Sequence, residues 1–297
     1  MSHSATRRTL LLALAAAPLA RAHATPTAQT AQTAPMPPDM RLVRLEAASG
    51  GRLGVAAWNT ADGRQLFHRA DERFPFCSTF KMMLSAAVLA KEPSVLQQNI
   101  RYDKAELVAH SPITEEHLDG GMTIEALCAA TIQYSDNTAA NLLIRHLGGP
   151  EEVTAYARSI GDRQFRLDRW ETALNSAIPG DPRDTTTPAA MMASLHKLTL
   201  GNALPPAKRK IMTDWLIGNT TGATRIRAGV PSSWKVGDKT GAGDYGTIND
   251  IAILWPPGNK PPIVLAVYLT QPGKDDKTRP EILGQAAKIV IDAFKVG

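Results

Sequence analysis

The stretch from Phe76 to Leu89 constrains the fold most, because it joins a serine and a lysine to a long apolar run. Ser78 and Lys81 are three residues apart, a spacing that places both side chains on one face of a helix. The residues after Lys81 are apolar on nearly all sides, and a helix of that kind belongs in a protein interior. The sequence therefore predicts a buried helix whose first turn carries a hydroxyl and an amine.

This pair of side chains has two interpretations. Burial lowers the pKa of a lysine amine, and an amine beside a hydroxyl can form an activated nucleophile. The alternative is a surface serine and lysine that open an ordinary core helix. Ser194 with Lys197 and Ser232 with Lys235 repeat the spacing, so the spacing alone leaves both interpretations open.

Residues 1–24 are typical of an export signal. Arg7 and Arg8 precede an apolar run, and Ala22-His23-Ala24 fits a cleavage site. The run is too short to span a bilayer, although a membrane anchor is the alternative, and the arginine pair fits twin-arginine export. We expect a periplasmic or secreted protein with no membrane association after cleavage, and a flexible tether over residues 25–38.

Charge and composition narrow the classes of partner and cofactor. Residues 1–24 hold three arginines and no acid, so their removal lowers the net charge from +5 to +2. We therefore expect no nucleic-acid partner, and Lys208-Arg209-Lys210 are interpreted as the solvated face of a helix. No histidines have close metal-ligand spacing, so no metal and no cofactor are expected.

The periodicity of apolar residues predicts an α+β fold. Strands are expected at 52–58, 65–68, 234–238, 249–255 and 262–270, and Asp62-Gly63 is a hairpin signal. Helices are expected at 40–48, 78–91, 123–133, 137–147, 150–160, 188–200, 205–217 and 280–294. We predict an antiparallel β-sheet flanked by helices, formed from both chain ends, with an inserted all-α domain. The α/β domain would comprise residues 39–72 and 218–297, and the all-α domain residues 73–217.

Three further motifs follow Ser78 in the chain. Ser135-Asp136-Asn137 lies between two predicted helices, Arg169-Trp170-Glu171 lies with Asn175 in a loop over residues 167–187, and Lys239-Thr240-Gly241 ends a predicted strand. Singly, each motif has an ordinary explanation, and Asp136 is expected to be a helix cap or structural acid. A loop that long in a compact domain is usually functional or disordered.

Together with Ser78 and Lys81, and in this order, these motifs resemble those of the class A serine β-lactamases. The resemblance runs from about Arg52 to the C-terminus and implies the serine β-lactamase and DD-peptidase-like fold. It implies hydrolysis of the β-lactam amide bond of penicillins and cephalosporins through a Ser78 acyl-enzyme, which a Glu171-activated water clears. Antibiotic resistance, a small-molecule β-lactam substrate and a monomer are the further expectations.

The resemblance also implies the site residues. The implied catalytic residues are Ser78, Lys81, Ser135, Glu171 and Asn175. The implied substrate-binding residues are Asn137, Lys239, Thr240, Gly241, Ala242, Arg225 and His110. Backbone N–H groups of Ser78 and Ala242 would form the oxyanion hole. Lys81 would hydrogen-bond Ser78, Glu171 and Asn137, and either Lys81 or Glu171 would be the acylation base.

Some positions depart from the family pattern. Ile248 stands where many members have a carboxylate-binding arginine, and Arg225 is expected to replace it, the alternative being a solvated arginine. Arg227 is expected to face the other way if the segment is extended, and to have little effect on catalysis. His110 stands in place of an aromatic residue, where it would either stack on a substrate or face water. Thr172 follows Glu171 where many members have proline, which leaves open whether that peptide bond is cis or trans.

The family pattern also bears on two pairs of side chains. Arg169 and Asp184 are expected to pair across the neck of the Glu171 loop. Cys77 and Cys128 each match half of a different family bridge, so free thiols are expected.

Two other functions share part of this pattern. A penicillin-binding transpeptidase or carboxypeptidase would share five positions but normally lacks Glu171 with Asn175; the shared residues are Ser78, Lys81, Ser135, Asn137 and Lys239. A β-lactam sensor domain would need a retained membrane segment or a signalling partner domain. The Glu171 loop therefore favours the hydrolase.

Overall fold

The computed structural model describes residues 39–295, together with Met1. The predicted export signal and the tether over residues 25–38 lie outside the described range, so those expectations are not addressed by the fold. No helix within residues 39–295 combines the length and the apolar character needed to cross a bilayer.

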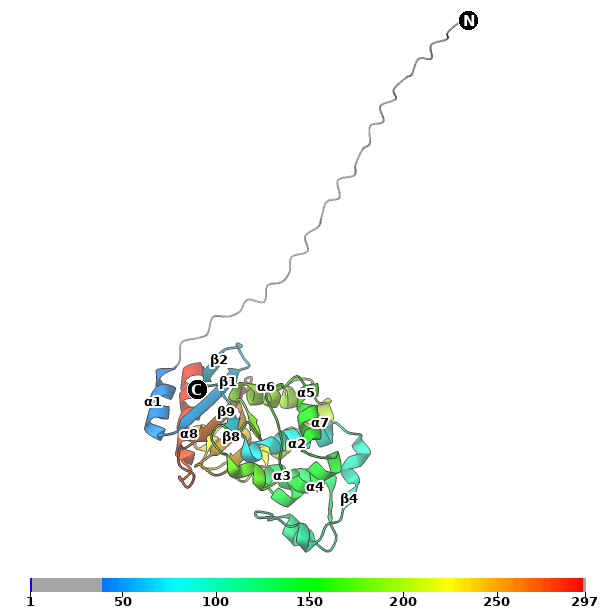
Figure 1. Cartoon of the computed structure of the whole chain (residues 1–297). Coiled ribbons are helices and arrows are strands. Elements are labelled where there is room, and N and C mark those ends of the chain that lie inside the picture. Colours follow the sequence, from blue (N-terminus) through cyan, green and yellow to red (C-terminus); the bar gives the residue numbers. More distant parts are fainter. Residues whose placement is uncertain (2–38, 296–297) are drawn as a thin grey trace. The chain divides into compact units, whose positions relative to one another are not determined.

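A five-stranded antiparallel sheet forms the centre of the described chain (Figure 1). Its strands are β1 (Arg52–Asn59), β2 (Gln65–His68), β7 (Lys235–Ala242), β8 (Ile248–Trp255) and β9 (Ile263–Thr270), in the order β2-β1-β9-β8-β7. The hairpin at Asp62-Gly63 joins β1 to β2, and β1 then pairs with β9 from the other end of the chain. This pairing confirms the predicted sheet built from both chain ends.

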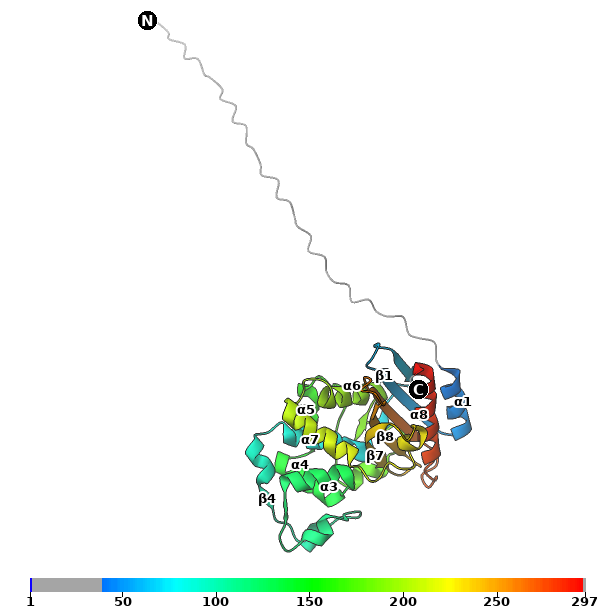
Figure 2. The ribbon, with the colours of Figure 1, turned by 180° about the vertical axis from the view of Figure 1, so that it is seen from behind.

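Strand β9 shows how the sheet separates two cores. Its side chains point alternately to opposite faces, as in any strand. Ile263, Leu265 and Val267 pack against the side of the sheet covered by α1 (Met40–Ser49) and α8 (Pro280–Phe294). Val264, Ala266 and Tyr268 join the core of the remaining helices on the other face (Figures 1 and 2).

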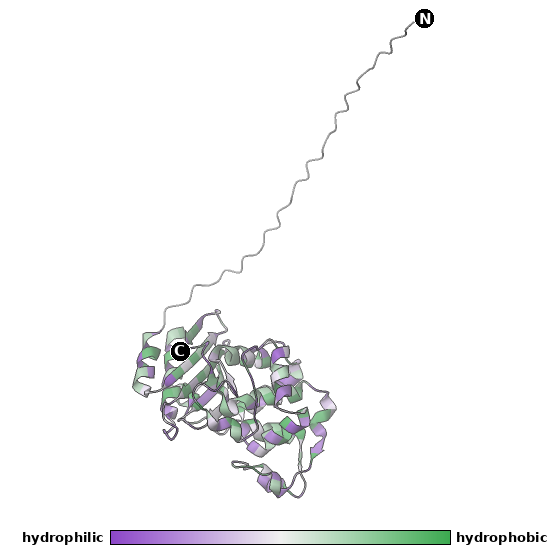
Figure 3. Ribbon diagram, in the orientation of Figure 1, coloured by the Kyte–Doolittle hydropathy of each residue, from purple (hydrophilic) through white to green (hydrophobic). Residues whose placement is uncertain are grey.

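Six helices build the second core. They are α2 (Phe80–Leu89), α3 (Ile124–Gln133), α4 (Asn137–Leu147), α5 (Pro150–Ser159), α6 (Pro188–Thr199) and α7 (Pro206–Ile217). All residues of α2 are buried, as its apolar pattern predicts. Most other helices carry both hydrophobic and hydrophilic residues, which is typical of helices with one buried side (Figure 3).

Short elements complete the chain. The two-residue strands β3 (Phe74–Pro75) and β6 (Thr185–Thr186) pair with each other, as do β4 (Asn99–Ile100) and β5 (Met122–Thr123). The 3-10 turns are η1 (Cys77–Thr79), η2 (Pro93–Gln97), η3 (Lys104–Glu106), η4 (Thr114–His117), η5 (Ala173–Ser176) and η6 (Ile226–Gly229).

Two predicted positions need correction. Ser78 lies in η1, immediately before α2, instead of in the first turn of the long helix. Lys239-Thr240-Gly241 lies inside β7 and not at its end, because each residue of the motif pairs with one residue of β8. The boundaries of the all-α domain at residues 72/73 and 217/218 stay predictions, since helices and sheet share one core.

The contact between η6 and α8 predicts a stability effect. A Cβ added at Gly229 would lie 1.9 Å from the backbone oxygen of Gly284, so α8 or η6 would have to shift. Gly229→Ala should therefore lower the free energy of unfolding by about 1–3 kcal/mol, measured by urea denaturation. Gly120→Ala, which meets nothing within 4 Å, is the control. Equal unfolding midpoints for the two variants would contradict this packing.

Candidate active site

The turn that carries Ser78 is tightly enclosed. Ser78 is 8% exposed, and Cys77 before it has a left-handed backbone with φ of 45°. Strand β7 passes directly beside this turn, because a Cβ at Gly241 would lie 2.8 Å from the oxygen of Phe76 and 3.2 Å from the nitrogen of Ser78. Only glycine at position 241 leaves room for this approach. The β7 backbone at Gly241 and the turn that carries Ser78 are therefore in direct contact.

Glu171 and Lys81 form a buried ion pair beside Ser78. The Lys81 Nζ lies 3.0 Å from Glu171 Oε1, and both side chains are fully buried. Burial lowers the pKa of the Lys81 amine, while the charge of Glu171 acts in the opposite direction. Lys81 also donates to Asn137 Oδ1 at 2.5 Å and to the Ser135 carbonyl at 2.7 Å.

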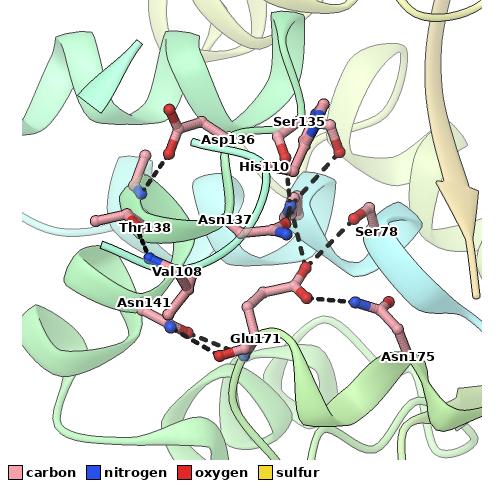
Figure 4. Close-up of polar contacts among 12 residues, drawn as sticks. Ser78, Val108, His110, Ser135, Asp136, Asn137, Thr138, Asn141, Glu171 and Asn175 are labelled. Atoms are coloured by element: carbon pink, nitrogen blue, oxygen red, sulfur yellow. Dashed lines mark hydrogen bonds and ion pairs between the residues drawn. The ribbon is translucent and has the colours of Figure 1, made fainter. Parts of the chain in front are cut away.

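The expected hydrogen bond between Lys81 and Ser78 is not present in residues 39–295. Instead, the Ser78 hydroxyl donates to Glu171 Oε1 at 3.3 Å (Figure 4). The Lys81 amine is held by the acceptors from Ser135 and Asn137 and by Glu171, which accounts for the difference. Glu171 therefore lies between the serine and the lysine.

A second buried lysine approaches Ser135 from β7. The Lys239 Nζ donates to the Ser135 hydroxyl at 3.1 Å and to the Thr240 carbonyl at 2.9 Å. Burial lowers the pKa of Lys239 well below its ordinary value, and the positive charges of Lys81 and Arg225 lower it further. Ser135 itself has a left-handed backbone with φ of 59°. Such a conformation in a non-glycine residue costs about 1–2 kcal/mol and is frequent at functional sites.

Asp136 has a structural position, as predicted. Its carboxylate caps α4 by accepting from the Ala139 N–H at 2.8 Å, and it accepts two further backbone N–H groups, from Ile113 and Thr114. Figure 4 shows Asp136 pointing away from Ser78 and Glu171. The carboxylate therefore fixes the junction that presents Ser135 and Asn137.

The backbone of Glu171 is clamped by a residue that the sequence analysis missed. Asn141 accepts from the Glu171 N–H and donates to its carbonyl, both at 2.9 Å (Figure 4). Asn141 lies four residues after Asn137 on α4, so both amides share one helix face. That spacing is the signal that could have identified it.

The other carboxylate oxygen of Glu171 accepts from Asn175 Nδ2 at 2.6 Å. The Oδ1 atom of Asn175 is buried and has no hydrogen-bond partner within the described part of the chain. The peptide bond between Glu171 and Thr172 is cis. One carboxylate thus contacts three side chains that are implicated in catalysis: Ser78, Lys81 and Asn175.

The neck of the loop is closed as predicted. Arg169 Nε lies 2.5 Å from Asp184 Oδ2, and the Asp184 side chain is buried. The other oxygen of Asp184 accepts the backbone N–H groups of Asp168 and Arg169. A buried carboxylate that accepts hydrogen bonds from a guanidinium and from backbone N–H groups holds the two ends of the loop together.

Arg225 reaches the Lys-Thr-Gly strand from the turn before η6. Its Nη1 donates to the carbonyl oxygens of Gly241 and Asn249, at 2.6 and 2.7 Å, and the residue is half-buried. The Thr240 hydroxyl lies 2.5 Å from the hydroxyl of Thr221, another residue that the sequence analysis missed. Arg225 therefore joins β7 to β8 at Gly241, the residue after Thr240.

Arg227 does not lie in the extended segment that was expected to turn it away from Arg225. Arg227 forms an ion pair with Asp238 at 2.6 Å, and the Asp238 side chain is fully buried. The segment is a 3-10 turn and not an extended strand, so the two arginines do not simply face opposite ways. Arg227 therefore balances the negative charge of Asp238, a buried residue of β7.

The structure also describes three further residues from the sequence analysis: His110, Cys77 and Cys128. His110 is exposed, with its Nε2 3.0 Å from the carbonyl of Tyr134. Cys77 and Cys128 are both buried and free, as expected. Within residues 39–295 no three His, Cys, Asp or Glu side chains lie close enough together to hold a metal ion.

Comparisons with known proteins agree with this arrangement. Residues 38–294 match the model of the β-lactamase enzyme family. β-Lactamase OXY-1 of Klebsiella oxytoca is 56% identical over 99% of this chain and all of its own length. β-Lactamase Toho-1 of Escherichia coli is 54% identical, with the same coverage.

A solved structure agrees as well. The β-lactamase from Desulfarculus baarsii DSM 2075 is 54% identical, with a TM-score of 0.86, and the match covers 87% of this chain and 97% of that one. The chain therefore belongs to the β-lactamase enzyme family and is a class A serine β-lactamase.

Proposed function

We propose that this β-lactamase hydrolyses the amide bond of penicillins and cephalosporins through an acyl-enzyme on Ser78, which confers antibiotic resistance. The observation that carries the mechanism is the position of one carboxylate. Glu171 accepts from the Ser78 hydroxyl with one oxygen and from Asn175 with the other. The same group can therefore serve the formation and the removal of the acyl-enzyme.

In the first half-reaction, Ser78 attacks the β-lactam carbonyl. Its hydroxyl proton passes to Glu171, which already accepts its hydrogen bond. Lys81 offers a second route for the Ser78 proton, because burial lowers the pKa of its amine and so favours the neutral form, which can accept a proton. The N–H groups of Ser78 and Ala242 stabilise the developing oxyanion. Ser135, which accepts from Lys239, delivers a proton to the leaving nitrogen.

The substrate is held by its carboxylate and its side-chain amide. The Lys239 amine, the Thr240 hydroxyl and the Arg225 guanidinium supply hydrogen-bond donors for an anionic group. Lys239, Thr240 and Arg225 bind the carboxylate at the β7 edge. The β7 backbone at Gly241 and Ala242, together with Asn137, binds the amide. His110 lies exposed at the rim, where it contacts the substrate side chain.

In the second half-reaction, Glu171 and Asn175 position and activate a water that attacks the Ser78 ester. The buried Oδ1 of Asn175 supplies an acceptor for that water, and Glu171 takes its proton. Asn141 holds the Glu171 backbone in place during this step. No cofactor or metal takes part in this scheme.

The protein's setting is also part of the proposal. The chain acts as a monomer on a small-molecule substrate in the periplasm or outside the cell, and binds neither nucleic acid nor membrane. A net charge of +2 after signal removal supports the absence of a nucleic-acid partner.

Glu171→Ala should separate the two half-reactions. Acylation should slow but continue through Lys81, whereas the acyl-enzyme should not be cleared without a carboxylate to activate water. Intact-protein mass spectrometry after mixing with benzylpenicillin should show a persistent adduct on Ser78. Glu116→Ala, at an exposed carboxylate, should retain turnover. Wild-type turnover by Glu171→Ala would exclude the role assigned to Glu171.

Arg225→Ala should weaken transition-state binding of the substrate carboxylate. A hydrogen bond to a charged group contributes about 1.5–3 kcal/mol, so kcat/KM for benzylpenicillin should fall roughly 10- to 150-fold. Arg225→Lys should recover only part of the loss, because lysine lacks the two-pronged guanidinium.

Arg101→Ala, at an exposed arginine, is the control for Arg225→Ala. Melting temperatures of both variants should be checked, since Arg225 also ties β7 to β8. A kcat/KM for Arg225→Ala equal to that of the control would show that Arg225 does not act on the substrate.

A further inference from the structure

A series of hydrogen bonds connects a buried carboxylate of β7 with the hydroxyl of Thr240. Asp238 accepts from Arg227 Nε with one oxygen and from Asn219 Nδ2 with the other, both at 2.6 Å. The Thr221 hydroxyl lies 2.8 Å from Asn219 Oδ1 and 2.5 Å from the Thr240 hydroxyl. We call the two contacts that link Asn219, Thr221 and Thr240 the hydroxyl chain.

The side-chain amide of Asn219 has only one orientation that fits its neighbours. The backbone N–H of Thr221 lies 3.2 Å from Asn219 Oδ1, and a backbone N–H can only donate. The amide oxygen therefore faces Thr221, and the amide nitrogen faces Asp238. An amide oxygen only accepts, so the Thr221 hydroxyl donates to Asn219.

The hydrogen of the Thr240 hydroxyl points toward Thr221. A threonine hydroxyl carries one hydrogen, and that of Thr221 is already used on Asn219. The 2.5 Å contact between the two hydroxyl oxygens needs a hydrogen between them, so Thr240 is its donor. The opposite direction would leave the oxygens of Thr221 and Asn219 2.8 Å apart with no hydrogen between them. Within residues 39–295 the Thr240 hydroxyl has no other partner.

The substrate carboxylate requires the same hydrogen. In the proposed function, on which this inference rests, Thr240 binds that carboxylate, and a carboxylate can only accept. Once the Thr240 hydrogen turns to the substrate, the two contacts of the hydroxyl chain share the single hydrogen of Thr221. One neutral hydrogen bond is therefore lost when the substrate binds, whichever way the Thr221 hydroxyl turns.

We propose that Thr221 is a positioning residue that competes with the substrate carboxylate for the hydroxyl hydrogen of Thr240, and thereby weakens the binding of the substrate. The carboxylate wins this competition, because hydrogen bonds to charged acceptors are stronger than those to a neutral hydroxyl. It is nevertheless held less tightly than it would be by a Thr240 whose hydrogen had no other acceptor.

Thr221→Val should tighten substrate binding. Valine keeps the shape of threonine but has no hydroxyl, so the Thr240 hydrogen loses its competing acceptor, while the backbone N–H at position 221 still donates to Asn219. The affinity is measured by isothermal titration calorimetry in a Ser78→Gly background, which cannot be acylated. The Kd of benzylpenicillin should fall roughly 2- to 10-fold, which corresponds to one neutral hydrogen bond.

Two control variants separate this effect from a change in packing. Thr221→Ser keeps the hydroxyl, so the Kd should stay at the value of the Ser78→Gly parent. Thr220→Val removes a neighbouring hydroxyl that donates to the Gln133 carbonyl and not to Thr240, so it should also leave the Kd unchanged.

An inhibitor without a carboxylate provides a further control. The Ki of phenylboronic acid, measured with Ser78 present, should be equal in Thr221→Val and the wild type. An unchanged or raised Kd of benzylpenicillin in Thr221→Val, or an equal fall in Thr220→Val, would overturn the proposal.

Neutron diffraction from deuterated crystals tests the directions of the hydrogen bonds without any change at Thr221. In the free enzyme, the deuterium of Thr240 should point to Thr221 and that of Thr221 to Asn219. In the benzylpenicillin adduct of Glu171→Ala, the deuterium of Thr240 should point to the substrate carboxylate instead. A Thr221 deuterium that points to Thr240 in the free enzyme would overturn the proposal.

The two crystals also distinguish failure of the hydroxyl chain from failure of the proposed function. The free-enzyme crystal contains no substrate, so it tests the chain alone. An adduct whose carboxylate does not contact Thr240 would overturn the assignment of Thr240 to the substrate carboxylate, and the competition with it.

Discussion

The buried contact between Lys81 and Glu171 is the interaction on which the rest of the site depends. Each charge would be costly in the core alone, and removing one partner of such a pair typically costs about 3–5 kcal/mol. The lysine comes from a helix with no exposed residue, and the carboxylate comes from a loop ninety residues later. Their contact therefore fixes the loop to the helix at Ser78.

The surrounding structure holds this pair in place from three directions. Asn141 clamps the Glu171 backbone, Arg169 and Asp184 close the neck of the loop, and Asp136 fixes the junction whose carbonyl holds Lys81. Strand β7 closes the fourth side, where Gly241 allows the sheet to touch the Ser78 turn. The two faces of one sheet thus serve different purposes: one carries α1 and α8, and the other supports the site.

Much of this arrangement could be predicted from the sequence. The helix over residues 137–147 has clear signals at both ends, Asp136 as its cap and Gly148 after it, and was predicted residue for residue. The pairing of both chain ends in one sheet followed from the strand pattern, and the motifs identified the residues that meet around Ser78.

What could not be predicted depends on distant contacts. The Ser78 turn is a 3-10 turn because the chain there is tied to Asp184 and to Asn249, neither of which is near in sequence. Asn249 lies on β8 opposite Gly241, and Thr221 contacts Thr240 on β7, yet single polar residues carry no periodic signal. Arg227 was expected to have little effect because nothing local indicates its buried partner, Asp238. Local patterns define elements, whereas long-range hydrogen bonds decide how elements begin and end.

The central claim is that Lys81 lies in a desolvated site where the charge of Glu171 supports its protonated form. NMR titration of ¹³C-labelled lysine side chains tests this most directly, in the wild type and in Glu171→Gln. Lys81 should titrate below the exposed lysines, and its midpoint should fall further in Glu171→Gln, because burial then acts without the opposing carboxylate. A Lys81 that titrates with the exposed lysines, or one that is unaffected by Glu171→Gln, would contradict the account.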